Sequence, residues 1–182
     1  MATLVPEHHE ALHRMAEEVP LEEIGSPKIK KVLKDMRAAL HAYNVDGFSG
    51  VAIAAPQIGV SLRIFYVEDM HPERGAEGKI PTMVAINPEI VKLSKQKKLV
   101  GEGCLSVNDA YGAVERASRA TIRAYDEHGV RFERGASGLL AHIFQHECDH
   151  LDGILFTDRA EKVWNRLDEE AARLAEKEAD KK

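Results

Sequence analysis

The 182-residue chain is long enough to bury a hydrophobic core but short for two domains, so we expect a single domain over residues 1–182. Its formal net charge of -5 gives no electrostatic reason to expect direct binding to nucleic acid. The N-terminal stretch lacks the basic-then-apolar pattern of a secretory signal, and no apolar run is long enough to span a bilayer, so we expect a cytoplasmic protein with no membrane partner.

The first clear helical pattern follows Ser26, a candidate N-cap, with Pro27 in the first turn. Apolar residues then recur at helical spacing, at Ile29, Val32, Leu33, Met36, Leu40 and Tyr43. This pattern predicts an N-terminal helix that lays one apolar stripe on the core.

The middle of the chain has features typical of β-strands. Residues 62–67 and 80–86 are short apolar runs rich in branched or aromatic side chains, and a polar, glycine-bearing loop at 71–79 separates them. Apolar and polar residues alternate over 119–134 on either side of a turn at 127–129. The alternation predicts a β-hairpin with one buried face.

Two helices are predicted in the last part of the chain. From Gly138 the apolar spacing becomes helical, and Gly153 is placed to end the element. Beyond it, one apolar side and one dense charged side predict an amphipathic C-terminal helix over about 158–178, with a frayed tail at 179–182.

The helix that starts at Gly138 carries the sequence HECDH at residues 146–150. Its two histidines are four residues apart, so both imidazoles project from one face and can bind one ion, with Glu147 alongside. A catalytic site usually takes three protein ligands and keeps one position for water. The best candidate for the third is Cys104 in the segment EGCLS, because glycines at 101 and 103 permit an irregular backbone that could present a thiolate. An isolated cysteine would otherwise be read as a buried apolar residue.

The segment GVAIAAPQIG at residues 50–59 is the third candidate part of a site. Its small residues allow close approach to a ligand, and the amide of Gln57 could stabilise an oxyanion. Small apolar residues before a proline are also typical of a tightly packed bend, so this segment alone is weak evidence.

GVAIAAPQIG, EGCLS and QHECDHLDG occur in the order and approximate spacing of the three signature motifs of peptide deformylases. The chain resembles this family over roughly residues 26–156. Together with the predicted elements, the resemblance implies an α+β fold in which antiparallel β-sheets pack around a central HExxH-bearing helix, flanked by the N-terminal and C-terminal helices.

The resemblance also implies roles for single residues. The implied metal ligands are Cys104, His146 and His150. Glu147 would be the general acid/base, and Gln57 with the backbone N–H of Leu105 would form the oxyanion site. The implied reaction removes the N-formyl group from formylmethionine at the start of a nascent polypeptide and releases formate. The cofactor would be Fe2+ in the cell, with Zn2+, Ni2+ or Co2+ able to occupy the same ligands, and the partners N-formylmethionyl peptides emerging from the ribosome.

Three features depart from the family pattern. Ala52 stands where glycine is usual in the first motif, and residues 107–111 (VNDAY) replace a run that commonly has a proline and later an arginine that helps hold the peptide. His142 lies one turn before His146, at a place that in the family lines the apolar pocket for the methionine side chain. The expected pocket residues are Val51, Ala52, Leu139, His142 and Ile143. We expect His142 to be partly exposed or hydrogen-bonded and not a fourth ligand, because the site needs an open position.

Two residues between the paired histidines have structural interpretations. Cys148 points away from the face of the histidines and is expected to be a packed thiol. Asp149 is expected to be a hydrogen-bond acceptor, either next to the metal ligands or on the helix surface, and not a ligand itself.

Two other functions compete with deformylation. A zinc protease shares the HExxH pattern but typically completes its site with histidine or a carboxylate, so Cys104 and Gln57 argue against it. A relative that keeps the metal but binds something else in a remodelled groove is compatible with Ala52, His142 and residues 107–111.

Overall fold

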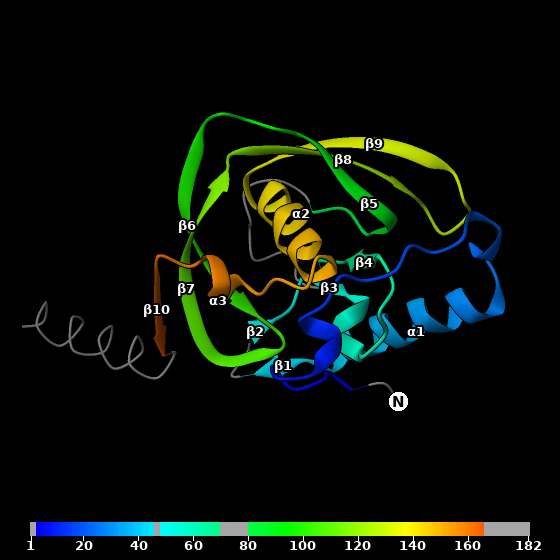
Figure 1. Ribbon diagram of the computed structural model, residues 1–182, viewed down its shortest axis with the longest axis horizontal. Coiled ribbons are helices and arrows are strands. Elements are labelled where there is room, and N and C mark those ends of the chain that lie inside the picture. Colours follow the sequence, from blue (N-terminus) through cyan, green and yellow to red (C-terminus); the bar gives the residue numbers. More distant parts are fainter. Residues whose placement is uncertain (1–2, 46–47, 70–79, 166–182) are drawn as a thin grey trace, which may run out of the picture.

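The computed structural model describes residues 3–45, 48–69 and 80–165, and it has the expected α+β class (Figure 1). Within these residues, antiparallel sheets of two, three and five strands have the orders β1-β2, β10-β7-β6 and β3-β4-β5-β8-β9. The helices are α1 (Pro27–Ala42), α2 (Gly138–Leu151) and α3 (Phe156–Arg159), with 3-10 turns at Glu10–Leu12, Leu21–Glu23 and Ala55–Ile58. The strands are β1 (Asn44–Val45), β2 (Phe48–Ser49), β3 (Ala52–Ala54), β4 (Ile64–Val67), β5 (Met83–Leu93), β6 (Lys97–Cys104), β7 (Val107–Ala117), β8 (Arg119–Tyr125), β9 (Arg131–Ser137) and β10 (Lys162–Asn165).

Both faces of the five-stranded sheet are covered around β4. Successive side chains of a strand point to opposite faces, so Phe65 and Val67 join the core under α2, whereas Ile64 and Tyr66 join the core under α1. All four are buried. Burial on both faces explains why residues 64–67 form a continuous apolar run, and β4 confirms the strand predicted within residues 62–67.

Helix α1 begins where the sequence predicts. The Ser26 hydroxyl accepts a hydrogen bond from the backbone N–H of Ile29 at 3.3 Å, and Pro27 is the first helical residue. The predicted apolar stripe is present, because Ile29, Met36 and Leu40 are buried against β3 and β4.

Helix α2 is the central element of the molecule, as the resemblance implies, and Figure 1 shows it enclosed by strands. It contacts strands of both larger sheets, namely β3, β5, β7, β8 and β9. Phe144 packs against Phe65 of β4 with ring centroids 6.1 Å apart. Because α2 lies between the two larger sheets, its HECDH segment is held in the interior.

The predicted hairpin is confirmed. Strands β8 and β9 pair from Arg119 opposite Ser137 to Tyr125 opposite Arg131. In the turn, a carboxylate oxygen of Asp126 accepts hydrogen bonds from the backbone N–H groups of residues 128 and 130.

The C-terminal helix expected over about 158–178 does not begin there. The short helix α3 ends at Arg159, and residues 162–165 form β10, which pairs antiparallel with β7. Backbone hydrogen bonds to the free edge of β7 outweigh the helical spacing of the apolar residues in this stretch. The remainder of the expected helix and the frayed tail lie outside the described residues, as does the whole of the expected loop at 71–79. In the described part of the chain, no helix is long and apolar enough to cross a membrane.

Gly153 ends α2 as predicted, and replacing it with alanine is expected to destabilise the fold by about 2 kcal/mol or more. Its φ is +73°, and a Cβ there would lie 2.6 Å from the backbone nitrogen of Arg14. Urea unfolding of Gly153→Ala measures the loss. Gly135→Ala is the matched control, because a Cβ at Gly135 meets only the Thr121 hydroxyl oxygen, at 3.5 Å. Equal midpoints for the two variants would contradict this prediction.

Candidate metal centre

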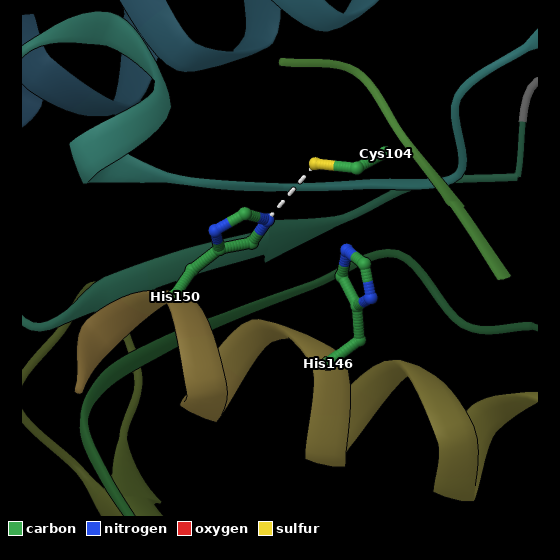
Figure 2. A group of neighbouring side chains, drawn as sticks. All are labelled: Cys104, His146 and His150. Carbon is green, nitrogen blue, oxygen red and sulfur yellow. Dashed lines mark hydrogen bonds between the residues drawn. The ribbon is translucent and has the colours of Figure 1, made fainter. Parts of the chain in front are cut away.

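The two histidines of the HECDH segment lie one turn apart on α2 and project toward Cys104 (Figure 2). Their ring centroids are 4.9 Å apart and the ring planes are nearly perpendicular. Cys104, the last residue of β6, places its Sγ 3.2 Å from Nε2 of His150. Potential ligand atoms of Cys104, His146 and His150 all lie within 4.8 Å of one another, so one ion could contact all three.

An irregularity at the end of β6 directs Cys104 toward the helix. The pairing with β7 is regular up to Gly103, which lies opposite Tyr111, and then shifts so that Cys104 pairs with Val107. A Cβ at Gly103 would lie 2.9 Å from the Tyr111 ring, so only glycine allows the ring this close. The irregular backbone expected from the glycines beside Cys104 is therefore present.

The electrostatics of the three side chains suit a divalent cation. Burial alone would raise the pKa of the Cys104 thiol, but the imidazoles of His150 and His146 outweigh burial and hold this pKa well below its usual value. The thiolate is the form that binds metals. Burial alone would lower the pKa of His146, but Cys104 and Glu102 raise it well above its usual value. A cation entering this cluster would take the place of protons on the same atoms.

Glu147 lies beside the cluster with one oxygen unpaired. The residue is 3% exposed, and its Oε2 has no hydrogen-bond partner among the described residues. Burial raises its pKa to about 7, and the neighbouring imidazoles offset only part of the rise. A buried carboxyl that is easily protonated and has a free oxygen is suited to exchanging a proton with a bound water or substrate.

Gln57 presents its amide nitrogen to the cluster. Its Oε1 accepts a hydrogen bond from the backbone N–H of Ala54 at 2.8 Å, which fixes the orientation of the amide. Its Nε2 then lies 3.4 Å from both Cys104 Sγ and Ser106 Oγ. Because the oxygen is already used locally, the donor end of the amide is the end that faces the centre.

A cavity of about 270 Å³ opens beside the cluster, and every predicted site residue except His150 lines it. Leu105, directly after Cys104, is one of these lining residues, and the five predicted pocket residues are Val51, Ala52, Leu139, His142 and Ile143. The tyrosines at positions 43 and 111 also line it. The sequence pattern predicted neither tyrosine as a pocket residue, although Tyr111 lies in the divergent segment 107–111.

His142 is partly buried in this lining, as expected, and it is not one of the three clustered residues. Burial lowers its pKa, and the positive charges of Arg116 and Lys98 add to that effect, whereas Glu102 opposes it. The neutral imidazole is therefore favoured, and it adds a polar group to an otherwise apolar wall.

A family model described as polypeptide deformylase matches residues 1–166. The chain belongs to the peptide deformylase family. Members of this family are metallohydrolases that remove the N-formyl group from nascent polypeptides. The chain is 43% identical over 144 residues to a peptide deformylase of Carboxydothermus hydrogenoformans, covering 79% of this chain and 84% of that protein. It is 42% identical over 158 residues to the chloroplastic/mitochondrial peptide deformylase 1A of Arabidopsis thaliana, covering 81% of this chain and spanning 57% of the plant protein.

Solved peptide deformylase structures have the same fold. That of Thermotoga maritima matches with a TM-score of 0.75 and 29% identity, covering 89% of this chain and 99% of that chain. A class I type b peptide deformylase of Acinetobacter baumannii bound to Met-Ala-Ser matches with a TM-score of 0.74 and 34% identity, covering 86% of this chain and 96% of that chain.

Next to the candidate metal centre lies a buried ionic network that the sequence pattern did not predict. Glu102 Oε2 lies 3.0 Å from Nδ1 of His146, and the same carboxylate accepts two hydrogen bonds from Arg116. Burial alone would raise the pKa of Glu102, but the hydrogen bonds from Arg116 and His146 lower it to about 2. The sequence did contain one indication of this network. Arg116 lies two residues after the apolar Val114 in a strand, so the two side chains share a face of β7 and both are buried.

The structure confirms that Cys148 is a packed thiol and that Asp149 is a hydrogen-bond acceptor. Cys148 is buried in the core cluster under α2, and burial raises its pKa to about 12. Asp149 accepts hydrogen bonds from Arg116 and from Arg159.

Proposed function

We propose that this chain removes the N-formyl group from N-terminal formylmethionine and releases formate, in N-terminal processing during protein biosynthesis. The unpaired Glu147 oxygen carries this proposal, because it lies beside the Cys104, His146 and His150 cluster in the cavity that Gln57 also lines. A proton acceptor, a metal-binding cluster and an amide donor together suit hydrolysis of an acyl group.

The three clustered side chains would hold the metal, and Fe2+ is the proposed ion in the cell. One thiolate with two imidazoles also suits Zn2+, Ni2+ or Co2+. A divalent ion held there supplies a Lewis acid that polarises the formyl carbonyl and lowers the pKa of water.

The residues of the chain would share the remaining steps. Glu147 accepts a proton at Oε2 from the attacking water. Nε2 of Gln57 and the backbone N–H of Leu105 donate hydrogen bonds to the oxyanion that forms on the formyl carbon. Glu147 then gives its proton to the departing amine, which leaves a free N-terminal methionine and formate.

The edges of the two larger sheets suit an extended peptide. Strand β6 is an edge strand of its sheet, strand β3 is an edge strand of the other, and residues of both line the cavity. A peptide lying between them could form backbone hydrogen bonds with either edge. The departure at Ala52 is compatible with this arrangement, because the residue is only 7% exposed and packs in the core under α2.

We also propose that the substrates are chains emerging from the ribosome, and that residues 1–182 act as one domain in the cytoplasm. The family activity supports the first proposal, because formylmethionine stands at the start of nascent chains. The shared hydrophobic cores along the described part of the chain support the second.

Release of formate from a small panel of formyl-Met peptides tests the proposed reaction. The protein is prepared with Fe2+ without oxygen, so that oxidation of the metal or its thiolate ligand is avoided. Formate is expected from the formylated peptides, and acetyl-Met peptides serve as the matched control. A preparation that binds one metal per chain but releases no formate from any of them would contradict the proposal and favour a binding protein with an altered groove. Cleavage of internal peptide bonds would favour a protease.

Gln57→Leu is expected to lower kcat by about 10²- to 10³-fold with unchanged metal content, because it removes an oxyanion donor. Steady-state kinetics with a formyl-Met peptide and metal analysis measure the two quantities. Ser106→Ala is the matched control, because it removes a neighbour of the same amide nitrogen and should change kcat only a few-fold. A Gln57→Leu enzyme with wild-type kcat would show that this amide has no part in the reaction.

A further inference from the structure

We propose that Arg159, on the short helix α3, is a positioning residue for the metal ligand His146. The inference rests on the proposed metal site, and it concerns a residue outside the three sequence motifs. Among the described residues, the side-chain hydrogen bonds of Arg159 go to Asp149, which neither lines the cavity nor belongs to the three clustered side chains. Arg159 therefore acts through a series of ionic hydrogen bonds.

The inner part of this series of hydrogen bonds, formed by Glu102 and Arg116, holds the imidazole of His146. Glu102 Oε2 lies 3.0 Å from Nδ1 of His146. Arg116 fixes the carboxylate of Glu102 with two hydrogen bonds, of 2.6 Å from Nε to Oε1 and 2.9 Å from Nη2 to Oε2. A partner on the second ring nitrogen of a metal-binding histidine sets the orientation of the ring.

The outer part of the series, formed by Asp149 and Arg159, joins Arg116 to α3. Arg116 Nη1 donates to Oδ2 of Asp149 at 2.6 Å. Arg159 donates to the same carboxylate twice, from Nε to Oδ2 at 2.7 Å and from Nη2 to Oδ1 at 2.8 Å. This two-point contact is the strong form of an arginine–carboxylate pair, and it leaves Asp149 little freedom to turn.

The charges of these four side chains explain why the outermost of them, Arg159, matters. Two carboxylates, Glu102 and Asp149, are balanced by two guanidiniums, Arg116 and Arg159. The side chains of Glu102, Arg116 and Asp149 are at most 10% exposed, whereas that of Arg159 is 44% exposed. Without Arg159, two buried carboxylates would compete for the single guanidinium of Arg116. Arg116 would then move toward Asp149, and Glu102 would hold His146 less rigidly.

The strand after α3 gives this contact a fixed base. Residues 162–165 form β10 and pair with β7, the strand that carries Arg116. The α3–β10 segment is therefore joined to β7 through the sheet and to α2 through the hydrogen bonds from Arg159 to Asp149. Arg159 is thus held in place from its own side as well.

The test compares Arg159→Gln, Arg159→Lys and Arg63→Gln in otherwise complete chains. Each purified protein is loaded with Co2+, its absorption spectrum is recorded, and the rate of metal loss to a chelator is measured. Arg63→Gln is the matched control, because Arg63 also pairs with a carboxylate at the end of α2, that of Asp152, but has no contact with Glu102 or Arg116. Thermal unfolding of the metal-free proteins reports the loss of stability separately.

We expect Arg159→Gln to lose Co2+ about tenfold faster than the wild type and to have a changed Co2+ spectrum. Removing a residue that orients a metal-binding histidine typically weakens metal binding by at least about tenfold. The rate of Co2+ loss from Arg159→Lys should lie between those of the wild type and Arg159→Gln, because lysine keeps the charge but not the two-point contact. Arg63→Gln should keep the wild-type rate and spectrum.

Wild-type rate and spectrum in Arg159→Gln would overturn the inference, as would equal acceleration in Arg63→Gln at equal loss of stability. If Arg159→Gln does not fold, the result for Arg159→Lys decides in the same way. A wild-type protein that binds no Co2+ would overturn the metal site itself, an outcome that the wild-type measurement alone reveals.

Discussion

Glu147→Gln is expected to keep its metal and lose about 10³- to 10⁴-fold in kcat. The carboxamide has the shape of the carboxylate but cannot accept the proton of the attacking water. Glu147 is suited to that task because burial raises its pKa to about 7 and its Oε2 has no partner among the described residues. The change leaves Cys104, His146 and His150 intact, so metal content should stay at one ion per chain.

Single-turnover formate release together with metal analysis checks this result. Glu115→Gln is the matched control, because Glu115 is an exposed carboxylate paired with Lys97 on the surface. It should retain the wild-type rate. Full activity in Glu147→Gln would remove Glu147 from the proton transfers, whereas loss of metal would assign it a role in binding the ion.

Cys104→Ser is expected to weaken metal binding by 100-fold or more, with a matching loss of activity at limiting metal. A serine hydroxyl is not deprotonated at neutral pH, whereas the imidazoles of His150 and His146 hold the pKa of the Cys104 thiol well below its usual value. The site would keep two neutral nitrogen ligands, too few for a firmly held catalytic ion. Titration with Co2+ in competition with a chelator measures the affinity.

Cys148→Ser is the matched control for this second prediction. Cys148 lies on the same helix, but its thiol packs in the apolar core and its pKa is raised to about 12. The buried hydroxyl should lower stability by about 1 to 3 kcal/mol, without changing metal stoichiometry. Wild-type metal affinity in Cys104→Ser would contradict the thiolate ligand and revive the zinc protease alternative, which uses a different third ligand.

The local elements of this protein can be predicted from sequence because they depend on interactions between residues close in the chain. A serine cap and a proline start α1, and the four-residue spacing of His146 and His150 places both rings on one face of α2. The hairpin of β8 and β9 follows from its alternation and its turn. The three motifs then predicted which distant residues meet, and the structure brings them together in one cluster and one cavity.

What only the tertiary structure decided depends on partners far apart in the chain. Residues 162–165 have helical apolar spacing but form β10, because β7 offers a free edge whose hydrogen bonds outweigh that spacing. Arg116 and Arg159 look like ordinary surface cations in the sequence. Their places in the ionic network follow from the packing of β7 and α3 around α2, which buries Glu102 and Asp149 and makes a paired positive charge necessary beside each.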